Sequence, residues 1–121
     1  PLIAQSFMPR VVADFNQNRM SGIVHGWIAD VKNMNPEGVS ACLHAMILRP
    51  DNTHMLYGSI PIHLIVSNTD PFLNPDAIEK MRQGTAVKFF SCIENCGHAS
   101  FVENPEQLKS ELERVWKSMG I

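Results

Sequence analysis

Two short apolar runs, residues 60–66 and 87–91, constrain the fold of this chain more than any other feature. The first is almost continuously apolar, which is typical of a strand that is buried on both faces. Between the runs, Asn74-Pro75 has the pattern of a helix N-cap followed by proline in the first turn, and Gly84 favours a helix end. A strand, a helix and a second strand in this order predict a right-handed parallel crossover, and hence an α/β fold.

The segment that follows the second run predicts a C-terminal helix. Asn104-Pro105 repeats the N-cap and first-turn proline, and Gly120 is placed to end the helix. Apolar residues then recur at helical spacing and define one face: Leu108, Leu112, Val115, Trp116 and Met119. We therefore expect residues 57–121 to form an α/β segment of two parallel strands, a crossover helix and a C-terminal helix.

The first half of the chain is predicted to be helical. Apolar residues recur at spacings of three and four over residues 20–31, and Asn35-Pro36-Glu37 begins a second helix that Pro50 stops. We expect that second helix to bury one apolar side, made of Val39, Cys42, Leu43, Met46 and Ile47. Residues 1–56 therefore form a predicted helical segment ahead of the α/β segment.

Two parallel strands are an incomplete sheet, because parallel sheets are covered on both faces and are rarely so narrow. The sequence thus predicts neighbouring strands from a second polypeptide, from another copy of the chain in a homo-oligomer, or from a further portion of the same protein.

Each apolar run leads into a loop with an ionisable residue, Asp70 after the first and His98 after the second. Ligands of open α/β sheets bind beyond the carboxyl ends of the strands, so these side chains are expected at the same edge. An acid beside an imidazole is two thirds of a nucleophilic triad. The other interpretations are an Asx turn for Asp70, which precedes Pro71, and a turn or capping histidine for His98.

The second half of the chain resembles the C-terminal part of α/β-hydrolases. An I-P strand start, a D-P loop and a G-H-x-x-x-x-E-x-P string carry the resemblance, through Ile60, Pro61, Asp70, Gly97, His98, Glu103 and Pro105. The resemblance implies that residues 1–56 are a cap or lid and that residues 57–121 hold the last two core strands. It further implies a cofactor-independent enzyme that acts on a small-molecule ester, lactone or related bond, with His98 as catalytic base and Asp70 as the residue that orients it.

The chain contains no G-x-S-x-G nucleophile elbow and no HGGG-type oxyanion segment. The nucleophile and oxyanion hole of such an enzyme would therefore lie outside these residues, and the chain is not a complete enzyme by itself. Two rival functions stay open: a non-catalytic, hydrolase-like interaction module and a self-associating fragment.

Other residues with chemical potential receive simpler interpretations. His63 interrupts the first strand and is expected to be a satisfied or partly exposed imidazole, with no catalytic role. Glu103 is expected to order the His98 loop and the start of the last helix. Ser100 lacks the glycine context of a nucleophile. Cys92, Cys96 and His98 offer only three zinc ligands without a paired C-x-x-C, so we predict no metal.

The net charge of −2, with no basic block, does not favour nucleic acid or an anionic membrane as partner. No apolar run has the length of a membrane span. Three cysteines without framework spacing are consistent with reduced thiols and a cytoplasmic location.

Overall fold

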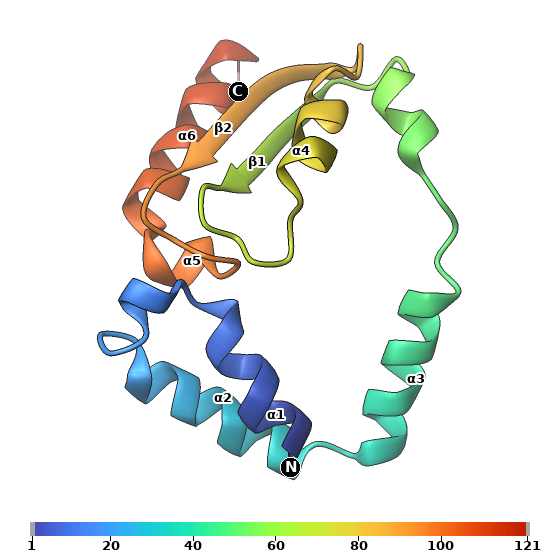
Figure 1. Ribbon diagram of the computed structural model, residues 1–121. Coiled ribbons are helices and arrows are strands. Elements are labelled where there is room, and N and C mark those ends of the chain that lie inside the picture. The colour runs from blue at the N-terminus through green and yellow to red at the C-terminus, as the bar shows by residue number, and fades with distance from the viewer. Residues whose placement is uncertain (1, 121) are drawn as a thin grey trace.

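The computed structural model describes residues 2–120. Pro1, the first residue of the predicted segment 1–56, and Ile121, the last residue of the predicted segment 57–121, lie outside the described residues. Helices and two strands follow one another along the chain (Figure 1), with η marking 3-10 helices. In order they are α1 (Leu2–Phe7), η1 (Met8–Val11), η2 (Asp14–Asn16), α2 (Ser21–Asn33), α3 (Pro36–Ile47), η3 (Thr53–Tyr57), β1 (Ile62–Ser67), α4 (Pro75–Arg82), β2 (Val87–Ile93), α5 (Ser100–Glu103) and α6 (Pro105–Ser118).

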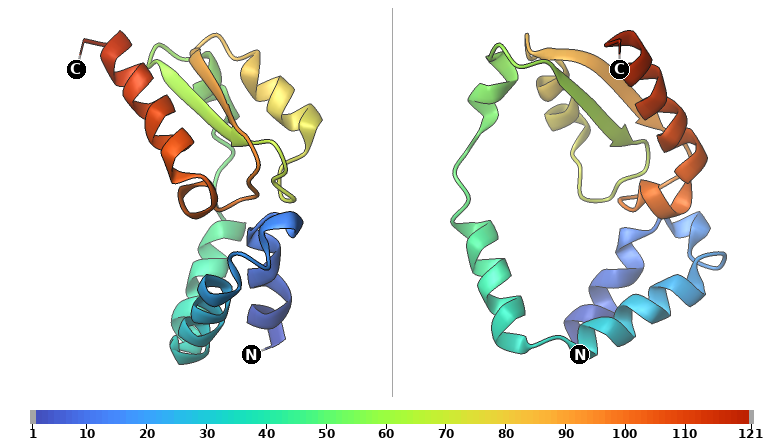
Figure 2. Two further views of the ribbon diagram at one scale, coloured as in Figure 1. Left: turned by 90° about the vertical axis from the view of Figure 1, so that its left-hand side faces the viewer. Right: turned by 180° about the vertical axis from the view of Figure 1, so that it is seen from behind.

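The predicted parallel pairing of the two apolar runs is confirmed. β1 and β2 form a two-stranded parallel sheet whose register runs from Ile62 opposite Val87 to Ser67 opposite Ile93. The strands lie between α6 and α4, which cover opposite faces of the sheet (Figure 2). The chain is therefore a mixed α/β protein, with the crossover helix and the C-terminal helix in the predicted places.

The Asn-Pro pattern begins three helices as predicted. The side chains of Asn35, Asn74 and Asn104 each accept a hydrogen bond from a backbone amide two or three residues on, at 2.9, 2.8 and 3.4 Å respectively. Each bond satisfies one amide that has no partner within the helix, and the following proline needs no such partner.

The N-terminal helices pack against one another and against the loop that follows β2. Their small core consists of Val12, Met20 and Val24, with Val102 of α5 packed against it. Figure 1 shows α1 and α2 side by side below the sheet, and the segment that joins them lies next to α5. This packing matters for the site, because α5 directly follows His98.

The prediction that α3 buries an apolar side is wrong. Val39 is only half-buried, Cys42 is exposed, and Leu43, Met46 and Ile47 are 51, 68 and 79% exposed. The physical reason is the position of α3. This helix follows α2 and precedes η3 in the chain, and it lies apart from the sheet (Figures 1 and 2). No other part of residues 2–120 covers that side. The apolar spacing therefore predicted the helix correctly but did not predict whether its apolar side is buried.

The boundary between the two predicted segments falls inside η3, which attaches to the α/β part. The carbonyl oxygen of Leu56 accepts a hydrogen bond of 2.8 Å from the amide of Ala86, just ahead of β2.

On α6, Val115 is buried, while Trp116 remains 53% exposed. None of the helices within residues 2–120 combines the length and apolar character that crossing a membrane requires.

Candidate active site

The loops that follow β1 and β2 are joined directly to each other. The amide and the hydroxyl of Thr69 both donate to the carbonyl oxygen of Cys96, at 3.3 and 2.7 Å. The backbone amide of Asn68, which directly follows β1, also donates a hydrogen bond to the carbonyl oxygen of Ile93 at 3.1 Å. These bonds hold the two loops together at the carboxyl edge of the sheet, where the next residues carry the ionisable side chains.

Asp70 and His98 form a hydrogen-bonded pair at this edge. His98 Nδ1 lies 2.8 Å from Asp70 Oδ2, and the other carboxylate oxygen accepts the amide of Phe72 at 2.8 Å. The Asp70 side chain is only 5% exposed, whereas that of His98 is 54% exposed. The structure thus brings the two predicted site residues together, with the acid behind the imidazole and the imidazole facing outward.

The pairing assigns the tautomer of His98. An ionised carboxylate can only accept a hydrogen bond, so Nδ1 carries the proton that points to Asp70. In the neutral ring Nε2 then has a lone pair, on a side chain that is 54% exposed. This is the arrangement in which an imidazole can take a proton from a group that lies next to Nε2.

Asp70 also forms the Asx turn that the simpler interpretation expected. Its Oδ1 bond to the amide two residues on is the mark of such a turn. Since the two oxygens serve different partners, the turn and the pairing with His98 coexist, and the turn fixes the carboxylate that faces the imidazole.

The backbone at His98 is held by the N-terminal segment. The amides of His98 and Ala99 both donate to the carbonyl oxygen of Val11, at 2.9 and 3.1 Å. Gly97 packs so closely there that an added Cβ would lie 2.7 Å from the backbone nitrogen of Ala13. Only glycine allows this approach, which explains why the residue before His98 has no side chain.

Glu103 ties these backbones together from inside. It is 4% exposed; Oε1 accepts the amide of Gly97 at 2.8 Å, and Oε2 accepts the amide of Ala13 at 3.0 Å and the side-chain amide of Asn16 at 2.8 Å. The expectation that Glu103 orders the His98 loop is confirmed. The start of α6 is instead capped by Asn104, and the sequence showed no sign that Glu103 would also bind the N-terminal segment.

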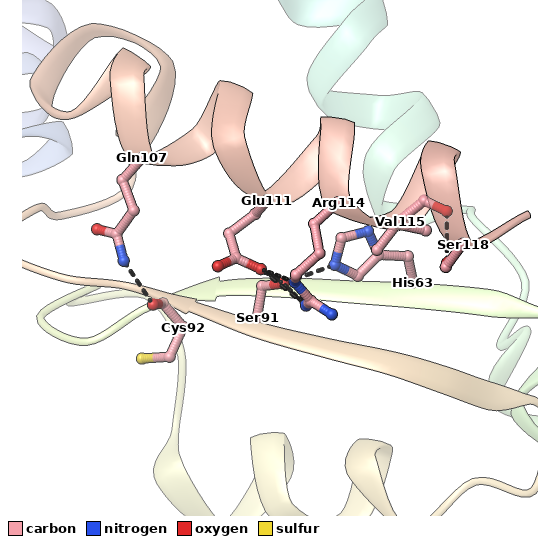
Figure 3. Close-up of polar contacts among 8 residues, drawn as sticks. All are labelled: His63, Ser91, Cys92, Gln107, Glu111, Arg114, Val115 and Ser118. Atoms are coloured by element: carbon pink, nitrogen blue, oxygen red, sulfur yellow. Dashed lines mark hydrogen bonds and ion pairs between the residues drawn. The ribbon is translucent and has the colours of Figure 1, made fainter. Parts of the chain in front are cut away.

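A second polar cluster joins both strands to α6 (Figure 3). His63 Nε2 lies 2.7 Å from Ser91 Oγ, which donates to Glu111 Oε2 at 2.7 Å, and Arg114 binds the same serine and glutamate at 3.3 and 2.8 Å. His63 is therefore a satisfied imidazole, as predicted. Sequence reasoning did not find the cluster, because its members come from three elements and only Glu111 and Arg114 are neighbours on a helix face.

This second cluster does not have the geometry of a nucleophilic triad. Ser91 gives its proton to Glu111, so His63 must act as the donor toward the serine oxygen and cannot serve as its base. Burial, followed by the charge of Arg114, lowers the pKa of His63, while hydrogen bonds from Ser91 and Arg114 lower that of Glu111. Ser91 is also buried, so the cluster fastens α6 to the sheet.

The cysteines near the site are directed into the protein. Cys96 is fully buried, its thiol lies 3.3 Å from Ser67 Oγ, and burial raises the pKa of both Cys92 and Cys96. Within residues 2–120, His, Cys, Asp and Glu side chains form no group of three or more that could hold a metal ion. Ser100, at the first position of α5, is half-buried.

The cavity nearest the pair is small. It has a volume of about 200 Å³ and lies between the N-terminal segment and the Asp70 loop, lined by Val12, Ala13, Asp14, Phe15, Thr69 and Pro71. A larger pocket of about 560 Å³ lies far from the pair, between the end of α3 and α4. Ligand pockets usually measure about 300–1,000 Å³, so the cavity beside Asp70 is smaller than a usual ligand pocket.

Comparison with known proteins adds no family assignment. The sequence matches no model of a protein family and no curated protein.

Proposed function

We propose that this chain is the C-terminal part of an α/β-hydrolase-like enzyme, and that it supplies the base and the orienting acid of a catalytic triad. The observation that carries the proposal is the 2.8 Å contact between His98 Nδ1 and Asp70 Oδ2, beyond the carboxyl ends of two adjacent parallel strands. The substrate class is a small-molecule ester, lactone or related bond, and the reaction needs no cofactor.

His98 acts as general base and then as general acid. Nε2 takes the proton from a nucleophile as that group attacks the carbonyl carbon, and returns it to the leaving group when the tetrahedral intermediate collapses. Asp70 keeps Nδ1 protonated and stabilises the positive charge that develops on the ring. The nucleophile and the oxyanion-hole amides belong to a segment outside residues 1–121, either a second polypeptide or a further portion of the same protein.

That segment would also complete the sheet and the pocket. It would supply a strand beside β1 and close the small cavity near Asp70 into a full substrate site. We propose that residues 1–56 act as the cap and residues 57–121 as the core part. The three free cysteines suit a reducing compartment, so we propose a cytoplasmic location.

Mass spectrometry of the purified protein tests the proposal first. Native masses of complexes and denatured masses of every chain should reveal a larger partner segment, and that segment should contain G-x-S-x-G and react with a fluorophosphonate probe. A homogeneous species made only of this chain would contradict the proposal that the chain is part of an enzyme.

Substitutions at the pair test the assigned roles in the completed enzyme. With 4-nitrophenyl acetate as substrate, His98→Ala should lower kcat about 10²- to 10⁴-fold or more, because general acid–base catalysis contributes that much. Asp70→Asn should lower kcat by up to about 10⁴-fold, since the amide favours the wrong tautomer. His25→Ala, at an exposed position on α2, is the control and should retain full activity. Unchanged kcat in His98→Ala would end the assignment.

An interaction module is the second candidate function, and the exposed apolar side chains of α3 favour it. Leu43, Met46 and Ile47 are all more than half exposed, and contiguous apolar surface of this kind marks contact sites. This function predicts a stable complex that has no reactivity with fluorophosphonates. A symmetric homodimer without turnover would instead indicate a self-associating fragment.

A further inference from the structure

Phe72 lies at the centre of the contacts around the Asp70–His98 pair. Its ring meets the imidazole of His98 edge to face, with centroids 5.2 Å apart and an angle of 86° between the planes. Its backbone amide donates to Asp70 Oδ1 at 2.8 Å. A single residue therefore contacts both members of the pair, one through its side chain and the other through its backbone.

The ring of Phe72 is itself held by the N-terminal segment. Phe7 of α1 stacks on it with centroids 5.2 Å apart and planes 27° apart, and the Arg10 guanidinium of η1 lies 5.5 Å from its centroid. The same segment accepts the amide of His98 through Val11. Phe72 is 36% exposed, and the rest of its surface is covered by contacts that include the imidazole and two N-terminal side chains.

The imidazole needs such support because its side chain is 54% exposed. The hydrogen bond at Nδ1 holds the ring at a single point, and the torsion about the bond that carries the ring is broad, so small rotations can bend and lengthen that hydrogen bond. An aromatic ring set edge to face restricts that rotation, and such pairs contribute beyond their buried area.

We propose that Phe72 is a positioning residue, which holds the His98 imidazole with Nδ1 toward Asp70 and Nε2 toward the reacting group. This inference rests on the proposed function, since it concerns the same imidazole. Phe72 acts through His98, and it needs no contact with substrate.

Exchange of the His98 Nδ1 proton with water, measured by NMR on the full chain, tests this role without any substrate. His98→Ala assigns the signal, and Asp70→Ala provides the fully released state. Phe72→Leu should accelerate the exchange about fivefold, as expected for the loss of one aromatic contact. The backbone bond from residue 72 to Asp70 remains in that variant, so only the ring is tested. Phe72→Tyr keeps the ring and should restore the wild-type rate.

Phe89→Leu is the matched control, because Phe89 is set edge-on to a different imidazole, that of His63, with centroids 6.0 Å apart. It should leave the His98 proton unchanged. If Phe72→Leu unfolds the chain, Phe7→Leu removes the ring stacked behind Phe72 and should accelerate exchange about twofold. Unchanged exchange in the folded variants, or a wild-type proton as labile as that of Asp70→Ala, would overturn the inference.

Kinetics of the completed enzyme separate this inference from the proposed function. Phe72→Leu should lower kcat for 4-nitrophenyl acetate about fivefold and leave KM unchanged, because the ring orients the base without binding substrate. Faster proton exchange in a protein without esterase activity would support the positioning role and remove the proposed function. A lower kcat with unchanged proton exchange would overturn the positioning role and leave the proposed function standing.

Discussion

Replacing Glu103 by alanine tests how the N-terminal segment and the His98 loop are held together. The carboxylate is 4% exposed and accepts three hydrogen bonds, from the amides of Gly97 and Ala13 and from the side chain of Asn16. The alanine variant leaves two buried backbone amides without their acceptor and removes one of the two acceptors of the Asn16 side-chain nitrogen, which also donates to the carbonyl of Asn95 at 2.8 Å. Unpaired buried donors carry the full penalty of lost hydration, so the variant should be strongly destabilised.

The magnitude follows from the three bonds. Hydrogen bonds to a charged group contribute about 1.5–3 kcal/mol each, and bonds that share one acceptor group do not add fully. We expect Glu103→Ala to lower the free energy of unfolding by about 4 kcal/mol. Glu103→Gln should cost about 2 kcal/mol, because its NH₂ group must face at least one of the donors.

Urea unfolding followed by far-UV circular dichroism measures this loss. With a slope of about 2 kcal/mol per molar urea, a loss of about 4 kcal/mol lowers the midpoint by about 2 M. Glu113→Ala is the matched control, because Glu113 is 47% exposed in a 3.9 Å surface pair with Lys109 and should contribute less than about 1 kcal/mol. A loss below about 1 kcal/mol in Glu103→Ala would refute the role of the carboxylate.

Two further changes probe the packing of the site loop and the cluster under α6. Gly97→Ala places a Cβ 2.7 Å from the Ala13 nitrogen and should lower the free energy of unfolding, measured with urea, by about 1–3 kcal/mol. Gly26→Ala is the control, because the space around its Cβ is open, and it should raise the free energy of unfolding by up to about 1 kcal/mol. Equal effects of the two substitutions would contradict the close approach at Gly97. Burial lowers the pKa of His63 in the folded protein below its usual value of 6.5. As the pH falls, the unfolded chain therefore binds a proton at this histidine before the folded protein does, and the free energy of unfolding should fall below about pH 6.5. Urea midpoints at about pH 7.5 and 5.5 should differ less in His63→Gln than in the wild type, and an equal difference would contradict this role.

The local elements of this protein could be predicted from its sequence because their causes are local. The N-caps at Asn35, Asn74 and Asn104 need only an amide two or three residues away. The parallel pairing of residues 62–67 with 87–93 followed from apolar runs and the helix between them. Asp70 and His98 were placed at one sheet edge by the same reasoning.

The burial of α3 could not be predicted, because helical periodicity describes a side of a helix and not what packs against it. Leu43 and Met46 have the spacing of a core side, yet they remain exposed. The burial of Glu103 was equally out of reach, since its partners Ala13 and Asn16 lie far away in the sequence.

The sequence by itself determined the helix starts, because each cap depends on residues close together in the chain. It also determined the parallel strand pairing and the loops that carry Asp70 and His98, because these follow from the order of strand, helix and strand. Only the tertiary structure decided the contacts of the site. It set the distance from His98 to Asp70, the Phe72 ring beside the imidazole and the docking of Val11 on the His98 backbone. These contacts join segments far apart in the chain, and their geometry depends on how whole elements pack.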